Sequence, residues 1–179
     1  MSTNERMENS METTQVEFSI ETEANKLVNR YMWWSMVGGL IPVPLVDIGA
    51  VTGVQLKMLS ELSKMYKVEF SKNRGKSIVS ALLGGVVADS MNRSLLTSVV
   101  KAIPVVNILG AVSMPIYSGA ATYAIGKLFI QHFESGGTFL DFNPQTVKEY
   151  FKELYAKGQE VARNLTNKQA PAPAPAPAK

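Results

Sequence analysis

The hydrophobic positions of this chain are gathered into long tracts that lie between polar ends. From Ala102 to Gly126 no side chain is charged. An uncharged stretch of about 18 residues or more is typical of a helix that crosses a bilayer, because the hydrocarbon core is about 30 Å thick and a helix rises about 1.5 Å per residue. Pro104 and Pro115 interrupt this tract, which is rich in glycine, alanine and serine. We therefore expect an all-α, membrane-associated bundle in which this segment packs against other helices.

A second apolar tract contains Pro42, Pro44 and a single charged residue, Asp47. The two prolines cannot both lie within a straight helix, because each lacks a backbone donor and clashes with the preceding turn. The tract therefore predicts two helices, at about 23–40 and 45–69. This pair fits a re-entrant or kinked hairpin as well as a full span.

The same pattern, an Ile-Pro pair followed by a predicted helix start, recurs loosely about sixty residues later. An Ile-Pro pair ending at Pro42 precedes Asp47, and a second such pair ending at Pro104 precedes Asn107. Transporters use paired broken helices to line a polar site at membrane depth. Chance recurrence of a helix start is the alternative interpretation of this short repeat.

Asp47 itself allows two interpretations. An ionisable group within an apolar tract is costly and indicates a functional site. A carboxylate in the first turn of a helix also stabilises the free amides there. We favour the capping role.

Two shorter features refine this picture. Trp33 and Trp34 lie where an aromatic belt would meet lipid headgroups, although core packing would also explain them. The uncharged segment 77–88 is too short to span a bilayer, and its Gly84 and Gly85 would allow another helix to approach closely.

Composition divides the chain into four parts. They are an acidic flexible leader, a hydrophobic helical membrane domain, an amphipathic C-terminal helix and an Ala-Pro tail, at 1–22, 23–142, 143–167 and 168–179. In the C-terminal helix we expect Asn143 as the N-cap and Pro144 as the first helical residue. An apolar heptad seam follows, formed by Val147, Phe151, Leu154, Gly158, Val161 and Leu165. This stripe should pack on its own domain, lie on a membrane or meet a partner.

The chemistry-bearing residues exclude most enzyme classes. There is no cysteine and only one histidine, His132, so a histidine-based triad or a metal site lacks partners. The motif Gly75-Lys76-Ser77 lacks the earlier glycine of a phosphate-binding loop, because Phe70 occupies that position. We therefore expect a non-enzymatic protein without a cofactor.

The distribution of charge predicts where the protein lies in the cell more than which partners it binds. The net charge is +3, and the segment 57–76 is basic. Basic segments beside membrane spans stay on the cytoplasmic side, and the phosphates that such a segment meets on so apolar a chain should be lipid headgroups rather than nucleic acid. The start of the chain does not match a secretory signal. These features predict a bacterial inner (cytoplasmic) membrane protein with the basic segment 57–76 facing the cytoplasm.

The run from Leu27 to Tyr66, with the later Gly84-Gly85 pair and the sequence FESGGTF, resembles the YcjF-like, GTPase-associated bacterial family of unknown function. The resemblance covers about 24–140. Proteins of that family are membrane proteins, and some are fused to or encoded beside Era-like GTPases. The resemblance implies no catalytic residues, and it marks as signature positions Pro42, Pro44, Asp47, Gln55, Lys57 and Met58.

Together these observations predict an integral membrane adaptor or regulator whose partners are the lipid bilayer and a separate GTPase. Self-association into a homo-oligomer stays open. A small transporter or pore that uses the broken helices is the competing class, and a soluble or peripheral helical bundle is the second alternative.

Overall fold

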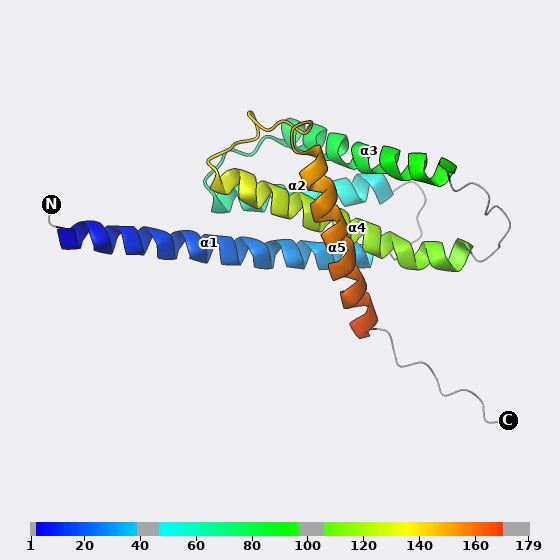
Figure 1. Ribbon diagram of the computed structural model, residues 1–179, viewed down its shortest axis with the longest axis horizontal. Helices are drawn as coiled ribbons and strands as arrows, with labels where there is room; N and C mark the ends of the chain where they lie inside the picture. The colour runs from blue at the N-terminus through cyan, green and yellow to red at the C-terminus, as the bar shows by residue number, and fades with distance from the viewer. Residues whose placement is uncertain (1–2, 39–46, 97–105, 170–179) are drawn as a thin grey trace, which may run out of the picture.

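The computed structural model describes the backbone of residues 3–38, 47–96 and 106–169, and the side chains within 11–37, 52–86 and 114–167. Five helices without a strand make up these ranges (Figure 1). They are α1 (Thr3–Gly38), α2 (Asp47–Met65), α3 (Lys72–Leu96), α4 (Val106–Glu134) and α5 (Lys148–Gln169). The predicted all-α class is therefore confirmed over the described residues.

The described helices end before and begin after the segments that contain the prolines. The first helix ends at Gly38 and the next begins at Asp47, while α4 begins at Val106. Pro42, Pro44 and Pro104 lie outside the described residues. Over the described ranges, none of the helices combines the length and the apolar character that crossing a membrane requires. The predicted span 102–126 coincides in its described part with α4, which continues through Pro115.

The core lies where α1, α2 and α4 meet. The helix α1 runs antiparallel to α4, with Val28 beside Gly126 and Met36 beside Gly119. A Cβ on either glycine would collide with the opposing side chain, so the missing side chains let the two helices approach closely. The fully buried side chains in this region include Phe129, Met32, Met58, Leu59, Leu62 and Ile125.

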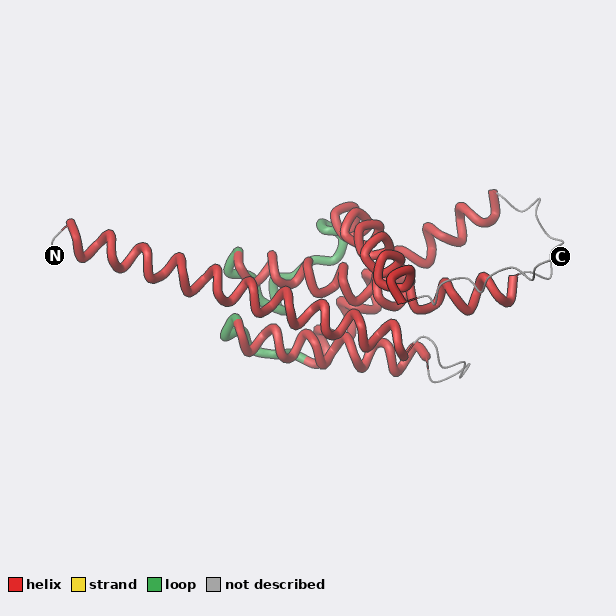
Figure 2. Tube along the Cα trace, turned by 90° about the horizontal axis from the view of Figure 1, so that it is seen from below, coloured by secondary structure: helices red, strands yellow, loops and turns green. Residues whose placement is uncertain are grey.

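The first half of α1 leaves the bundle. Figures 1 and 2 show it extending well beyond the ends of the other helices, and all side chains from 11 to 19 are exposed. The acidic segment 1–22, expected as a flexible leader, is helical from Thr3 and continuous with the rest of α1.

The helix α5 crosses α4 and packs on its own domain, which was one of the three expected roles of its apolar seam. Phe151, Leu154 and Ala162 are buried against the bundle. The predicted start at Pro144 was early, because 144–147 form turns and the helix begins at Lys148. Asn143 caps these turns, with its Oδ1 accepting the Gln145 N–H at 3.0 Å.

The prediction for the segment 77–88 also needs correction. It lies inside α3, a helix of 25 residues. A Cβ at Gly84 would meet nothing within 4 Å, and one at Gly85 would meet only the Lys148 side chain at 3.5 Å. These glycines do not mark a close contact between two helix backbones.

Two helices end in the same hydrogen-bonded turn. After α4, the Gly137 N–H donates to the His132 carbonyl and the Gly136 N–H donates to the Phe133 carbonyl, with Gly136 at φ 79°. After α2, the Val68 N–H donates to the Ser63 carbonyl, and Lys67 holds the left-handed position at φ 56°. Glycine takes this conformation easily, whereas a lysine is strained by it.

Candidate functional site

One end of the bundle exposes large apolar side chains. Trp33, Trp34 and Val37 lie near the C-terminal end of α1, and Met114 and Tyr117 lie in the first part of α4. Because α1 and α4 are antiparallel, all five lie toward the same end, on the right in Figure 1. Trp34 is 62% exposed and Trp33 is 38% exposed. We call this region the tryptophan end.

A groove between α1 and α2 adjoins the tryptophan end. Its lining residues are Arg30, Tyr31, Trp34, Gly53, Val54 and Lys57. The groove combines a tryptophan with two cations. Lys57, one of the signature positions, thus faces a surface feature rather than the core.

Glu61 joins the two helices beside this groove. Its Oε1 accepts the Tyr31 hydroxyl at 2.7 Å, and its Oε2 accepts an Arg30 guanidinium N–H at 3.0 Å. The Lys57 ammonium lies 3.6 Å from Oε1. Burial and the hydrogen bond to Glu61 raise the pKa of Tyr31 to about 12, so this phenol remains a donor at neutral pH. Sequence reasoning missed Glu61, because Arg30 and Tyr31 lie on another helix about thirty residues away.

Buried polar side chains lie one turn closer to the tryptophan end. Thr122 donates to the Ser118 carbonyl at 3.1 Å, so the hydroxyl contact of 2.7 Å between Ser35 and Thr122 has Ser35 as its donor. The amide of Gln55 is fully buried, and among the described side chains and backbone neither its nitrogen nor its oxygen has a hydrogen-bond partner. An amide buried without partners is destabilising, which makes this signature position unusual.

The remaining candidate residues are divided between the core and the ends of helices. Met58 is fully buried in the core. Asp47 is the first residue of α2 and Asn107 is the second residue of α4, and both helices begin at the tryptophan end. The side chains of these two residues lie outside the described part of the chain.

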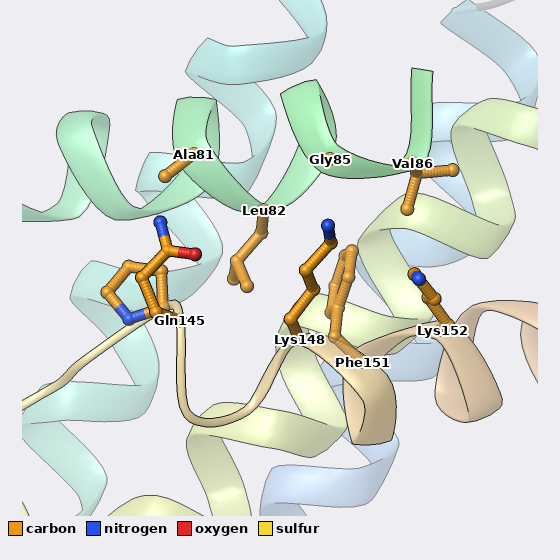
Figure 3. Close-up of a pocket in the computed structure, with 9 residues that line it drawn as sticks. Ala81, Leu82, Gly85, Val86, Gln145, Lys148, Phe151 and Lys152 are labelled. Atoms are coloured by element: carbon orange, nitrogen blue, oxygen red, sulfur yellow. The ribbon is translucent and has the colours of Figure 1, made fainter. Parts of the chain in front are cut away.

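A second hollow lies between α3 and the start of α5 (Figure 3). It encloses about 230 Å³. Leu82 and Phe151 supply apolar surface, while Lys148 and Lys152 bring two ammonium groups to it. Lys152 is paired with Glu149 at 2.9 Å.

His132 has a structural role at the opposite end of the bundle. Its ring packs edge-on against Phe142, and its Nε2 lies 2.8 Å from the Thr138 carbonyl oxygen. The ring of Phe129 stacks parallel to that of Phe142, with the two ring centroids 4.7 Å apart. Within the described ranges, no three histidine or acidic side chains gather in a way that could hold a metal ion.

The fold and the site define a helical-bundle protein with an exposed apolar end and a cationic groove beside it. The chain belongs to the domain of unknown function family DUF697, which matches residues 4–160. It is 35% identical over 150 residues to magnetosome membrane protein 22 of Magnetospirillum gryphiswaldense, covering 83% of this chain and 77% of that protein. No solved structure matches the chain. The finer resemblance to the YcjF-like family stays a prediction.

Proposed function

We propose that this protein is a non-enzymatic adaptor of the bacterial inner membrane, held to the bilayer by its tryptophan end. The observation that carries the proposal is the clustering of exposed Trp33 and Trp34 with Val37, Met114 and Tyr117 at one end. Tryptophan favours the boundary between hydrocarbon and headgroups, since its ring is apolar and its N–H is a donor. The relative named as a magnetosome membrane protein supports association with a membrane.

The sequence next to the tryptophan end also supports an orientation in which this end faces the bilayer. The segment 39–46, which follows α1 in the chain, contains no charged residue, and 97–105, which precedes α4, contains one, Lys101. Most of the basic segment 57–76 belongs to the far end of α2 and the start of α3, away from the tryptophan end. The proposed orientation therefore keeps this segment on the cytoplasmic side. Basic segments beside a membrane contact are typically retained on that side.

The proposed partner-binding element is the free first half of α1. Met11 and Phe18 are two turns apart on one face of this helix and are both exposed, Phe18 by 71%. An exposed apolar pair on an otherwise acidic helix is suited to docking in a groove of another protein. On the family resemblance, the partner to test first is an Era-like GTPase of the same bacterium.

Vesicle sedimentation tests the membrane contact. The wild-type protein should pellet with phosphatidylcholine vesicles, and Trp33→Ala/Trp34→Ala should weaken this binding at least tenfold, since each ring buries a large apolar area. The control is Phe18→Ala/Leu140→Ala, which removes two large apolar side chains that are more exposed than the tryptophans and lie outside the tryptophan end. Equal binding by the tryptophan variant and wild type would overturn the proposed contact.

Fractionation of cells distinguishes integral attachment from the peripheral alternative. An integral protein should stay in the pellet after an alkaline carbonate wash and be released only by detergent. Release by carbonate would replace the integral proposal with a peripheral bundle, and recovery in the first supernatant would remove the membrane proposal altogether. A cysteine at Asn73 should resist an impermeant thiol reagent in intact cells if the basic segment is cytoplasmic.

The partner proposal needs its own test. Vesicle-bound wild-type protein should retain an Era-like GTPase, whereas Met11→Glu/Phe18→Glu should lose the GTPase and still bind vesicles. Glu12→Gln/Glu17→Gln is the control for a general change on α1. Retention of the GTPase by the Met11/Phe18 variant would contradict docking on this face.

One observation favours transport as a second candidate function. Gln55 buries an amide that has no hydrogen-bond partner among the described residues, on a helix that begins at the same end of the bundle as α4. Ion or proton flux should then appear in liposomes with the wild-type protein and disappear with Asp47→Asn at equal folded protein. Such a result would replace the adaptor proposal, and absence of flux in both proteins would exclude the transport alternative.

A further inference from the structure

We infer that the groove between α1 and α2 binds the phosphate of an anionic phospholipid headgroup, with Arg30 and Lys57 as its ligands and Trp34 as its apolar wall. The inference rests on the proposed membrane contact of the tryptophan end and adds to it a lipid class and a binding site. All six lining residues belong to two helices that Glu61 holds together.

The depth of the two cations matches that of headgroup phosphates. Arg30 precedes Trp34 by four residues on α1, and Lys57 follows Gly53 by four residues on α2. Because the helices are antiparallel, both cations lie about one helical turn, or about 5.4 Å, farther from the tryptophan end than the other two residues. Phosphates lie just outside the aromatic belt of a membrane protein, where lysine and arginine ends are also found.

The charge of the groove favours an anion. Two cations share one carboxylate, which leaves the cluster with a net charge of +1. The side chains of Arg30 and Lys57 are 60% and 64% exposed, so both can reach a ligand in the groove. Glu61 accepts one hydrogen bond from the Arg30 guanidinium, a group that has five N–H donors. The remaining donors suit the oxygens of a phosphate.

The shape of the groove favours a lipid over a free phosphate ion. The groove is open, and a Cβ placed on Gly53 would meet nothing within 4 Å. Trp34 and Val54 add apolar surface that a glycerol backbone can cover but an inorganic ion cannot use. A site with one net charge in open solvent holds a free ion weakly, whereas a bilayer already in contact with Trp34 brings its phosphates close to the groove.

Vesicle binding with and without phosphatidylglycerol tests the site. Arg30→Gln/Lys57→Gln should bind vesicles containing phosphatidylglycerol about 25-fold more weakly than wild type, at about fivefold for each cation near an anionic surface. The control Arg74→Gln/Lys76→Gln removes the same charge from exposed positions at the start of α3, and it should weaken binding less than about twofold. Equal loss in both variants would overturn the site in favour of unspecific charge attraction.

Binding to pure phosphatidylcholine separates this inference from the proposed function. The Arg30/Lys57 variant should bind such vesicles as wild type does, which also shows that the variant is folded. If wild type binds neither kind of vesicle, the membrane proposal fails. If wild type binds both kinds equally, the membrane proposal stands and the anionic site is overturned.

Two further measurements identify the ligand. Glu61→Gln should strengthen binding to phosphatidylglycerol vesicles about fivefold relative to Glu69→Gln, a matched change outside the groove; equal effects would contradict the groove. Inorganic phosphate, added at constant ionic strength, should not displace the wild-type protein from these vesicles. Displacement by phosphate but not by chloride would assign the groove to a free phosphate ion instead of a lipid.

Discussion

Gly158 of α5 lies directly against the backbone of Ala120 in α4. A Cβ at Gly158 would stand 2.9 Å from both the Cα and the carbonyl oxygen of Ala120. The backbone of a packed helix cannot move aside as a flexible side chain can. Gly158 therefore fixes the distance at which α5 crosses the bundle.

Gly158→Ala should lower the free energy of unfolding. Overpacking costs about 1–3 kcal/mol and exceeds the gain of about 1 kcal/mol that alanine brings to a helix interior. Urea denaturation gives the change from the transition midpoint. Gly84→Ala is the control, because a Cβ there meets nothing within 4 Å, and it should raise stability by up to about 1 kcal/mol. Stabilisation by both substitutions would contradict the close crossing.

Lys67→Gly should stabilise the protein by about 0.5–1 kcal/mol, because Lys67 holds a left-handed conformation after α2 that glycine adopts without strain. Gly136 occupies the same position after α4 with φ 79° and open space around its Cα. Gly136→Ala should therefore destabilise by a similar amount. Thermal unfolding of the two variants would show shifts of opposite sign, and shifts of the same sign would refute the shared turn.

Gln55→Met should raise the free energy of unfolding by about 1–2 kcal/mol, since it replaces an unpartnered buried amide with an apolar side chain of similar size. Thr122→Val removes the hydroxyl that accepts from Ser35 and should lower stability by about 1–3 kcal/mol. Both changes are measurable by chemical denaturation. A destabilised Gln55→Met would mean that the amide has a partner in solution.

The pKa of Tyr155 predicts a loss of stability in alkali. Burial raises it from the ordinary value of 10.0 to about 12. A folded pKa above the unfolded one stabilises the fold fully below pH 10, and this contribution is lost as the pH rises from about 10 toward about 12. Tyr155→Phe keeps the ring and should show a shallower decline in stability over that window. Identical pH profiles for the variant and wild type would argue against a buried phenol.

Local backbone chemistry made part of the fold predictable. The prolines at 42 and 44 predicted two separate helices, and the described helices α1 and α2 lie on either side of them, ending at Gly38 and beginning at Asp47. The seam through Phe151 and Leu154 identified the buried face of α5 because helical periodicity depends only on neighbouring residues. The start of α5 was misplaced, since Asn143 and Pro144 are as suitable for the turns that precede a helix as for its first residues.

The candidate site was less predictable, because it depends on pairs that are distant in sequence. Lys57 and the tryptophans could be singled out, but Arg30 and Glu61 meet only after two helices fold together. The resemblance marked Gln55 without indicating that its amide would be buried and unpartnered. The absence of charged residues also predicted a membrane span at 102–126. None of the described helices is both long and apolar enough to cross a membrane. Uncharged small residues in α4 suit tight packing inside a bundle equally well.

The length of α1 sets an electrostatic distance in the proposed orientation. With 36 residues the helix is about 54 Å long, and Glu21 lies about 20 Å along it from Trp34. The Debye length at physiological ionic strength is about 8 Å, so even this nearest glutamate of the acidic segment is more than two screening lengths from the bilayer. The acidic half of the helix can therefore stay fully charged without repelling anionic lipids. A basic partner drawn to it would meet that charge clear of the membrane surface.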